Sequence, residues 1–310
     1  MNKKLITALV ALTLIVPATT YAAPLQNRTV NVPTIAILDT AIDTSLPILK
    51  DKIVYEVCIT QWSTCPNGQP TMEGPGSATL PKPNILQNGF DHGTQMAVIA
   101  VNNNPNIKIV FVRIIGMNSW GGRQATGEPT VYNGLQWVID NQAKFNIQAV
   151  SMSQGHHNLL PLNEYCPSTP TTESKIKTLK DMGVPVFFPT GNQRDYQKID
   201  WPACIPDSIA MGATMPNKEI AIYSNFDPKL TDFFAQGTTT SLSPNNTKVN
   251  VAGTSASTVT AATQWATIKS IKPTLTYSQV YELISRTSTP TKNSKLSGGK
   301  LINLQGAING

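Results

Sequence analysis

The chain has 310 residues, of which 40% are hydrophobic and 14% charged, with 20 Gly, 23 Pro and a formal net charge of +6. This apolar content is enough for a sizeable core and excludes a mainly disordered chain, while Gly and Pro interrupt every stretch that could form a coiled coil. The basic excess is scattered, with no Lys/Arg run longer than a pair, so we expect no nucleic-acid partner.

The first segment has the features of a secretory signal peptide. Lys3 and Lys4 precede an apolar run from Leu5 to Val16, which has the length of a signal-peptide core and is too short to span a bilayer. Thr20-Tyr21-Ala22 then offers a small residue at the end of a cleavage site. We therefore place a signal peptide at 1–22, with the cut directly after it or one residue later. An uncleaved amphipathic anchor is the alternative.

All four cysteines follow this leader, namely Cys58, Cys65, Cys166 and Cys204. An even number in an exported chain indicates two disulfides, for which three pairings are open. A zinc site is the rival interpretation, but the chain has no C-x-x-C pair and only three His. We expect a secreted protein, or alternatively a periplasmic one. No later run approaches about 18 apolar residues, so we expect no membrane partner after signal cleavage.

Short apolar strands alternate with helical stretches along the rest of the chain. The expected strands are rich in Val, Ile or Phe and are bounded by turn-forming residues; they are Thr34–Leu38, Lys108–Ile114, Ala149–Ser153, Val184–Pro189 and Ser208–Ala213. Helical patterns occupy Gly93–Asn102, Val131–Asn141, Glu173–Met182, Ser255–Ile271 and Ser278–Arg286. This alternation predicts an α/β fold of three layers, in which a mostly parallel sheet carries helices on both faces.

The segment from Lys50 to Asp91 departs from this pattern. It holds two of the cysteines and several turns rich in Gly and Pro. We expect a loop-rich insertion at about 50–91, stapled by a disulfide and containing a short strand at Lys52–Val57. No internal repeat or composition step marks a second domain, so we expect one domain over residues 23–310.

Polar residues stand where the expected strands end and the expected helices begin, which is where α/β folds place functional groups. Asp39 follows a buried strand in I-L-D-T-A, and Asn192 follows another in F-P-T-G-N. His92 opens a helix in D-H-G-T-Q-M-A, and Ser255 opens one in A-G-T-S-A-S. Each residue taken singly is explained by a turn or a helix cap. Their combination indicates a shared site.

Together these segments resemble the subtilisin-like serine proteases, or subtilases. The matching pieces are D-T-A, H-G-T-x-x-A, S-x-S-x-G, T-G-N and G-T-S-A-S, and they follow the family's order, in which the Asp precedes the His and the His precedes the Ser. The likeness covers nearly the whole mature chain. It implies a subtilisin-like fold and an exported serine endopeptidase that hydrolyses polypeptide substrates through an acyl-enzyme intermediate.

The resemblance also implies the role of each catalytic group. Ser255 would be the nucleophile, activated by His92 as general base, because a serine hydroxyl is a poor nucleophile without an adjacent base. Asp39 would hold the imidazole tautomer and stabilise the imidazolium. The backbone N–H of Ser255, at a helix start, and the side-chain amide of Asn192 would face the developing oxyanion.

Substrate binding follows from the same likeness. Two short segments would form the walls of the primary specificity pocket, and the first would also pair with an extended peptide; they are Ser153, Gln154 and Gly155 on one side and Pro189, Thr190 and Gly191 on the other. The stretch 117–125 could not be aligned with a second peptide-binding strand of the family.

Within this framework we favour the disulfides Cys58–Cys65, which closes a short loop, and Cys166–Cys204, which would tie the two pocket walls together. The chemistry requires no cofactor. Many family members bind structural calcium, but no Asp/Glu cluster here identifies metal ligands, so such a site stays unassigned. We expect a monomer.

Family members generally carry a prosegment between the signal peptide and the catalytic domain. Asp39 follows the expected cut too closely to leave room for one, so we expect none. Folding would then proceed unaided, favoured by early disulfides, or with a separate helper protein acting in trans.

Four positions depart from the family's usual pattern: Ala41 replaces a Gly, Gln95 replaces a second His, Ala256-Ser257 replaces Met-Ala, and the polar Gln154 replaces an apolar residue. These changes bear on specificity and efficiency and leave every catalytic group in place. The alternative function is a catalytically silent peptide-binding protein on a subtilase fold. A periplasmic solute-binding protein would fit the leader and the α/β pattern but would explain none of the motifs.

Overall fold

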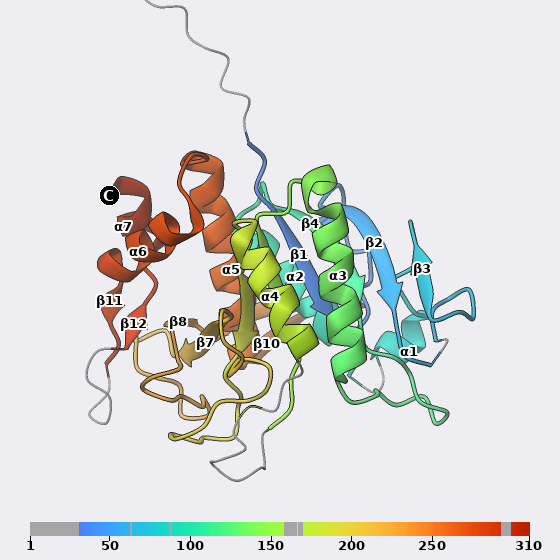
Figure 1. Ribbon diagram of the computed structural model, residues 1–310. Coiled ribbons are helices and arrows are strands. Elements are labelled where there is room, and N and C mark those ends of the chain that lie inside the picture. Colours follow the sequence, from blue (N-terminus) through green and yellow to red (C-terminus); the bar gives the residue numbers. More distant parts are fainter. Residues whose placement is uncertain (1–30, 63, 87–88, 158–165, 167–169, 293–298) are drawn as a thin grey trace, which may run out of the picture. The chain divides into compact units, whose positions relative to one another are not determined.

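A ten-stranded sheet in the order β11-β12-β8-β7-β6-β5-β1-β4-β2-β3 lies at the centre of the computed structural model (Figure 1). Neighbouring strands are parallel apart from β2 with β3 and β11 with β12. A separate antiparallel pair joins β9 to β10. The strands are β1 Thr34–Asp39, β2 Ile53–Ile59, β3 Thr71–Glu73, β4 Lys108–Arg113, β5 Ala149–Met152, β6 Val186–Pro189, β7 Ile209–Thr214, β8 Phe233–Gln236, β9 Thr238–Leu242, β10 Lys248–Ala252, β11 Thr289–Pro290 and β12 Lys300–Leu301.

Helices cover both faces of this sheet. One face packs against α3 (Glu128–Phe145) and α4 (Pro170–Asp181), and the other packs against α2 (His92–Asn103) and α5 (Thr254–Ile271). The remaining helices are α1 Lys82–Leu86, α6 Tyr277–Thr287, α7 Leu304–Asn309 and the short 3-10 helix η1 Pro47–Leu49. The predicted three-layer α/β fold with a mostly parallel sheet is confirmed.

A hydrophobic core lies on each face of the sheet, which explains why the strands are continuous apolar runs in the sequence. Side chains alternate across a strand, so Ile35 and Ile37 of β1 face the core shared with α2 and α5. Ala36 and Leu38 face the core shared with α3 and α4. Because both faces of β1 are covered, every one of its six residues is buried, including its last residue, Asp39.

The structure describes residues 31–310 except 63, 87–88, 158–165, 167–169 and 293–298. The predicted signal peptide at 1–22 lies outside the described residues. Residues from Asn31 onward form one unit, and no helix within the described part is long and apolar enough to cross a membrane. All five predicted strands and all five predicted helices are present, with ends displaced by at most four residues.

The segment 50–91 contributes more to the sheet than its turns suggested. The strand expected at Lys52–Val57 extends to Ile59 as β2 and pairs in parallel with β4. Val57 and Ile59 are buried against the core that α3 covers. The loop-rich character begins only after this strand, where β3 folds back onto β2.

Helix α5 is buried along most of its length because it packs against five strands, β1 and β5 to β8. Small residues allow this close approach. The hydroxyls of Thr258, Thr263 and Thr267 donate to the carbonyl four residues earlier, so these polar groups are satisfied inside the helix. The start of α5 is therefore held firmly against the sheet.

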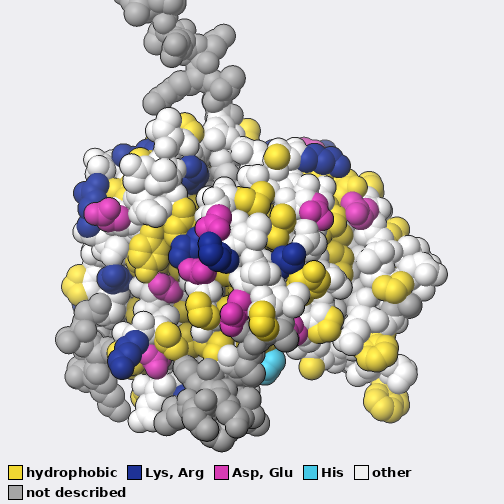
Figure 2. Space-filling view, in the orientation of Figure 1, with side chains coloured by type: hydrophobic (Ala, Val, Ile, Leu, Met, Phe, Trp, Pro, Cys, Tyr) yellow, Lys and Arg dark blue, Asp and Glu magenta, His cyan; other side chains and the backbone are white. Residues whose placement is uncertain are grey.

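Basic and acidic side chains are mixed on the surface that carries α3 and α4. On the face that Figure 2 shows, neither sign of charge gathers into a stripe. Lys177 lies 2.6 Å from Asp181, and Lys180 lies 2.5 Å from Asp207. This face therefore carries no basic stripe of the kind that binds nucleic acid.

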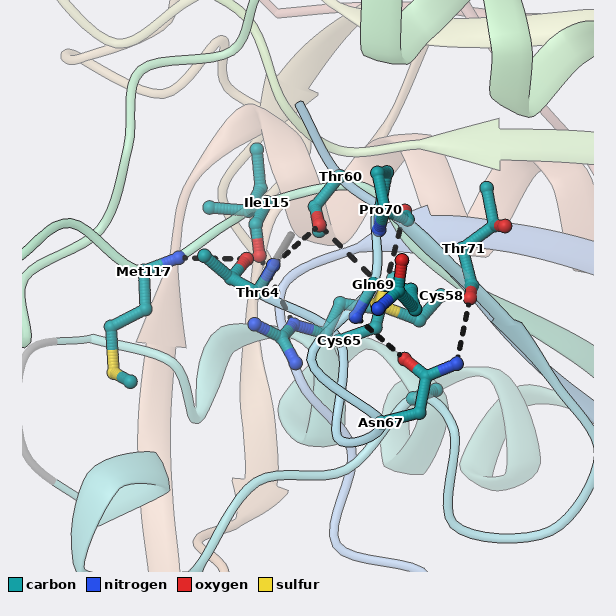
Figure 3. Close-up of a disulfide and its surroundings, with 12 residues drawn as sticks. Cys58, Thr60, Thr64, Cys65, Asn67, Gln69, Pro70, Thr71, Ile115 and Met117 are labelled. Atoms are coloured by element: carbon teal, nitrogen blue, oxygen red, sulfur yellow. Dashed lines mark hydrogen bonds between the residues drawn. A yellow bond between two sulfur atoms is a disulfide. The ribbon is translucent and has the colours of Figure 1, made fainter. Parts of the chain in front are cut away.

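Both predicted disulfides are present, Cys58–Cys65 and Cys166–Cys204. Figure 3 shows the first, which ties the end of β2 to the loop that leads to β3. The side chain of Asn67 closes that loop by accepting from the backbone N–H of Gln69 and donating to the carbonyl of Thr71. None of the four cysteines is free, which removes the zinc alternative.

Removing the two disulfides should destabilise the protein unequally. The entropy that a cross-link removes from the unfolded chain grows with the size of the closed loop, and the sequence separations are 7 for Cys58–Cys65 and 38 for Cys166–Cys204. Replacing both cysteines of the longer loop by Ala should lower the free energy of unfolding by about 4 kcal/mol, against about 2.5 kcal/mol for the shorter loop. Urea titration of each double variant measures this difference. Equal losses would contradict the loop-size argument.

Candidate active site

The predicted functional segments meet at the carboxyl ends of three central strands. β6, β5 and β1 are neighbours and run in parallel, so their carboxyl ends lie side by side. β1 ends at Asp39, β5 leads into Ser153, and β6 ends at Pro189. The order of the strands thus brings together segments that are more than 100 residues apart in sequence.

His92 is the first residue of α2 and contacts Asp39. Its Nδ1 atom lies 2.8 Å from Oδ1 of Asp39, which is fully buried, while the His92 side chain is 24% exposed. The start of α2 is held against the end of β1, because the N–H of Gly93 donates to the hydroxyl of Thr40 at 2.8 Å. A Cβ on Gly93 would lie 2.7 Å from the carbonyl oxygen of Ala41, so only glycine permits this approach.

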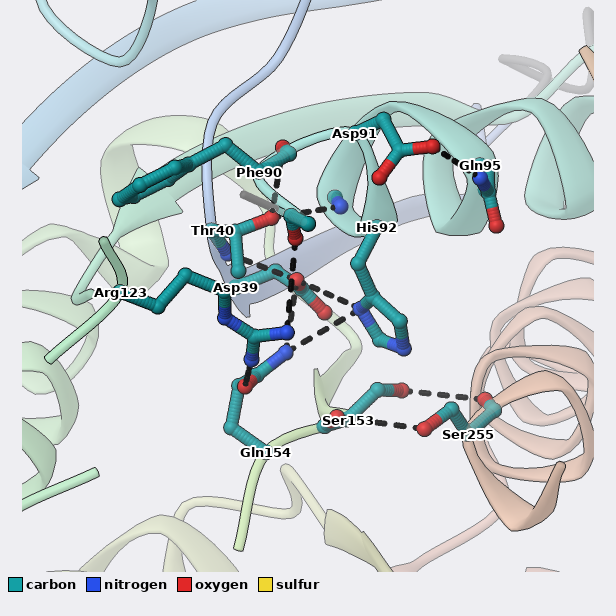
Figure 4. A network of polar contacts seen from close by, with 12 residues as sticks. Asp39, Thr40, Phe90, Asp91, His92, Gln95, Arg123, Ser153, Gln154 and Ser255 are labelled. Carbon is teal, nitrogen blue, oxygen red and sulfur yellow. Dashed lines mark hydrogen bonds and ion pairs between the residues drawn. The ribbon is translucent and has the colours of Figure 1, made fainter. Parts of the chain in front are cut away.

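The carboxylate of Asp39 is held by three donors on a single oxygen. Oδ1 accepts from the backbone N–H of Thr40 at 2.6 Å and from Nε2 of Gln154 at 2.9 Å, in addition to the contact with His92. Oδ2 is buried and has no hydrogen-bond partner among the described residues. Donors on Oδ1 therefore fix how the carboxylate is turned toward the imidazole (Figure 4).

Ser255 is the second residue of α5 and is linked to the end of β5. Its hydroxyl donates to the carbonyl of Ser153 at 3.3 Å, and the hydroxyl of Ser153 donates to the carbonyl of Ser255 at 3.0 Å (Figure 4). The adjacent residue Gln154 contacts His92, so one short segment joins both predicted catalytic side chains. At 3.3 Å the Ser255 bond is longer than the usual 2.5–3.0 Å, so the hydroxyl can turn away at little cost.

Asn192 is oriented by Thr254, a residue that sequence analysis left without a role. Its Oδ1 accepts from both the backbone N–H of Thr254, at 2.9 Å, and the hydroxyl of Thr254, at 3.1 Å. The amide oxygen is thereby held by Thr254. The Nδ2 group of the exposed Asn192 is on the other side of the amide and points away from Thr254. Thr254 stands in the G-T-S motif, which is the signal that could have identified it.

The backbone before Asn192 requires a glycine. Gly191 has φ +109°, and a Cβ there would lie 2.4 Å from Nδ2 of Asn225 and 2.4 Å from the carboxyl group of Asp200. The N–H of Gly191 donates to the hydroxyl of Thr254 at 3.2 Å. This turn sets Asn192 beside the start of α5.

The two predicted pocket walls are joined by a third segment, Asp200–Trp201. The N–H of Asp200 donates to the carbonyl of Thr190 in one wall at 2.8 Å. The carbonyl of Trp201 accepts from the N–H of His156, which follows Gly155 of the other wall, at 3.1 Å. Pro189 and Thr190 are themselves buried.

A second Asp–His pair lies in this region, and sequence analysis did not find it. Nδ1 of His157 is 2.9 Å from Oδ1 of Asp200, and Nδ2 of Asn225 donates to the same oxygen at 3.1 Å. Burial raises the pKa of Asp200, and the contact with His157 opposes that rise. The pair braces the segment between the two walls.

The Gln154 side chain is directed toward the Asp39–His92 pair. The residue is 5% exposed, and Nε2 of its carboxamide contacts both Asp39 and His92, while its backbone belongs to the predicted wall. No cluster of three or more His, Cys, Asp or Glu side chains in the described part of the chain could hold a metal ion. Structural calcium therefore remains a hypothesis without assigned ligands.

Comparisons with known proteins point to one family. A family model described as the subtilase family matches residues 31–307. Subtilisin E of Bacillus subtilis (strain 168) is 28% identical over 290 residues, which are 88% of this chain and 65% of that protein. Subtilisin BL of Lederbergia lenta is 27% identical over 242 residues, which are 75% of this chain and 82% of that protein. The chain thus spans slightly less than two thirds of the length of subtilisin E.

Solved structures show the same fold. A protease from Pseudoalteromonas arctica superposes with a TM-score of 0.72 and 20% identity, covering 90% of this chain and 93% of its own. The prenylagaramide maturation protease PagA superposes with a TM-score of 0.67 and 18% identity, covering 91% of this chain and 94% of its own. At these identities the likeness concerns the arrangement of helices and strands.

Proposed function

Because this chain belongs to the subtilase family, we propose that it is an exported serine endopeptidase with Asp39, His92 and Ser255 as its catalytic triad. The observation that carries the proposal is the buried carboxylate of Asp39, 2.8 Å from Nδ1 of His92 at the edge of the sheet where α5 begins. A carboxylate that accepts from Nδ1–H leaves the lone pair of Nε2 free to take a proton from a serine hydroxyl.

The first chemical step forms a bond between Oγ of Ser255 and the carbonyl carbon of the substrate. The Ser255 hydroxyl leaves the carbonyl of Ser153 and gives its proton to Nε2 of His92. The resulting oxyanion would be faced by the backbone N–H of Ser255, in the first turn of α5, and by Nδ2 of Asn192. The amide oxygen of Asn192 is held by Thr254, which presents the amide hydrogens.

The second step breaks the carbon–nitrogen bond of the substrate. The imidazolium of His92 gives its proton to the leaving amine, and the acyl group remains on Ser255. Water then attacks the acyl-enzyme, His92 takes a proton from that water, and the regenerated hydroxyl of Ser255 receives it as the acid product leaves. Every proton is thus returned, and no cofactor is consumed.

The proposed substrates are polypeptides bound in an extended form. An extended peptide would pair with the backbone of Ser153–Gly155, as in other cases where a strand is added to a sheet edge. The two disulfides support an oxidising compartment outside the cytosol. We propose secretion into the medium, with the periplasm as the alternative, and immunoblots of culture supernatant and periplasmic extract distinguish them.

The test of the proposed activity is incubation of the purified protein with an unstructured polypeptide such as casein. Cleavage should be abolished by a serine-directed covalent inhibitor, and mass spectrometry of the inhibited protein should find the label on Ser255. Binding of the polypeptide without cleavage would instead establish the catalytically silent alternative. Cleavage that the inhibitor leaves unchanged would contradict the triad.

Replacing Asn192 by Ala should lower kcat by about 10²–10³-fold, which is the cost of losing one oxyanion donor in subtilisin. KM should change little, because the amide bonds chiefly to the charge that develops in the transition state. Steady-state kinetics with a peptide substrate measures both constants. Thr254→Val, which removes the hydroxyl that helps hold the Asn192 oxygen, should lower kcat by a smaller factor in the same direction. An unchanged kcat with a raised KM would assign Asn192 to substrate positioning.

A further inference from the structure

The carboxamide of Gln154 lies between the guanidinium of Arg123 and the Asp39–His92 pair (Figure 4). Nη2 of Arg123 donates to Oε1 of Gln154 at 2.6 Å. Nε2 of Gln154 lies 2.9 Å from Oδ1 of Asp39 and 3.1 Å from Nδ1 of His92. Both Oε1 and Nε2 of the Gln154 side chain are therefore hydrogen-bonded.

The orientation of this carboxamide is dictated by its partners. A guanidinium can only donate, so it selects the amide oxygen, and a carboxylate can only accept, so it selects the amide nitrogen. The bond from Arg123 is charge-assisted and polarises the amide, which strengthens the N–H groups that face Asp39. A flipped Gln154 would set two donors against each other and two acceptors against each other.

Nε2 of Gln154 and Nδ1 of His92 cannot each donate a hydrogen bond to the other when both carry hydrogen. When Nδ1 of His92 carries a proton, that proton and the amide hydrogens of Gln154 both seek Oδ1 of Asp39. The third donor on this oxygen is the N–H of Thr40, while Oδ2 has no partner among the described residues. Gln154 and the Thr40 N–H together thus hold Oδ1 toward the imidazole and resist rotation of the carboxylate about its Cβ–Cγ bond.

Arg123 connects this arrangement to a hairpin beside the site. Met117 and Arg123 form an antiparallel bridge, and the side chain of Asn118 accepts from the N–H groups of Trp120 and Gly122 within the turn. Nη1 of Arg123 also donates to the carbonyl of Gly89 at 3.4 Å, a short distance before His92 in the chain. The anchor of Gln154 is therefore itself held by two segments.

We propose that Gln154 is a positioning residue for the Asp39–His92 pair, anchored by Arg123, and not a residue that selects substrate side chains. This inference rests on the proposed serine peptidase function. It assigns a purpose to the polar residue that stands where related proteins usually carry an apolar one. It also separates two roles that kinetics can distinguish, because a positioning residue acts on kcat and a pocket residue acts on the ranking of substrates.

The first test is Gln154→Met, which keeps the length of the side chain and removes both its donor and its acceptor. We expect kcat to fall by about 10- to 100-fold, as for the loss of a hydrogen bond to a charged group. KM, and the ratio of kcat/KM values across a series of peptides that differ only at the residue before the cleaved bond, should stay within about twofold of wild type. A retained kcat with a changed ratio would overturn the proposal in favour of a pocket role.

Two further variants control for general disturbance of the site. Gln136→Met removes a glutamine that also donates to an aspartate, Asp140, at 2.7 Å, but it lies on α3, which covers the opposite face of the sheet from the helix that carries His92. Its activity should match wild type. Arg123→Met changes an exposed residue, so it tests the anchor even if Gln154→Met fails to fold. Its kcat should fall by less than that of Gln154→Met, and adding it to Gln154→Met should cause no further loss, whereas additive losses would contradict a shared network.

A readout without catalysis separates this proposal from the proposed function. In the Ser255→Ala protein, the low-field proton resonance of His92 Nδ1–H should shift or broaden on Gln154→Met and stay in place on Gln136→Met. An unchanged resonance would refute the positioning role whether or not the wild-type chain cleaves peptides. A shifted resonance with an inactive wild type would leave the positioning intact and refute the peptidase assignment.

Discussion

Replacing Ser255 by Ala should leave the fold intact and lower kcat for peptide hydrolysis by about 10⁶-fold, the cost of the corresponding loss in subtilisin. The hydroxyl is the only group removed, and its hydrogen bond to the carbonyl of Ser153, at 3.3 Å, contributes little to stability. Without it no acyl-enzyme forms. The residual rate over water, about 10³–10⁴-fold, would come from the oxyanion donors and from substrate binding.

Ser270→Ala is the matched control for this variant. Ser270 lies on the same helix, α5, and its hydroxyl also donates to a backbone carbonyl, that of Thr267. Its activity should equal that of wild type, and thermal unfolding should place both variants close to wild type. Turnover by Ser255→Ala within tenfold of wild type would refute the assignment of the nucleophile.

Replacing Asp39 by Asn should lower kcat by about 10⁴-fold. The three donors on Oδ1 require an acceptor there, so we expect the oxygen of the new carboxamide at that position and its NH₂ group at the position of Oδ2. The arrangement of His92 would be retained, and the negative charge that stabilises its imidazolium would be lost. The NH₂ group would take the buried position of Oδ2, which makes no hydrogen bond to the described residues, and an unpaired donor there should lower the free energy of unfolding by about 1–3 kcal/mol.

Asp43→Asn shows whether such a loss is specific to Asp39. Asp43 is also buried, four residues further along, and it accepts from the N–H and the hydroxyl of Ser45. We expect Asp43→Asn to change kcat by less than threefold in the peptide assay. A kcat for Asp39→Asn within tenfold of wild type, or an equal loss in both variants, would contradict the role of Asp39 in the triad.

The main sheet could be predicted because strands buried on both faces leave a strong mark in sequence. The run K-I-V-F-V-R of β4 has no solvent-facing position to interrupt it. β9 and β10 lie outside that sheet, are mostly half-exposed and are built largely from Thr, Ser, Asn and Val. β8 is as short as β5 and β6, but its run F-F-A-Q holds no Val or Ile to mark it as a strand. These strands were not predicted.

Some residues of the candidate site could be predicted from local sequence, whereas others depend on contacts between residues distant in the chain. Asp39, His92, Asn192 and Ser255 could be singled out because each stands at the end of a strand or the start of a helix. The direction of the Gln154 side chain could not, because it depends on Arg123, 31 residues away in the chain. The contact of His157 with Asp200 spans 43 residues and involves no motif. Such pairings follow from side-chain geometry that periodicity does not encode.

The disulfide between Cys166 and Cys204 also determines whether the protein falls into two pieces when its backbone is cut. It closes a covalent ring that contains α4, β6 and Asn192. Under the proposed function, copies of the exported peptidase would meet one another in solution, so their own surface loops would compete as substrates. A single cut inside the ring leaves one connected molecule, in which the packed pieces cannot diffuse apart. Such nicked chains would migrate as one species on a denaturing gel without reductant and separate into two fragments only after reduction.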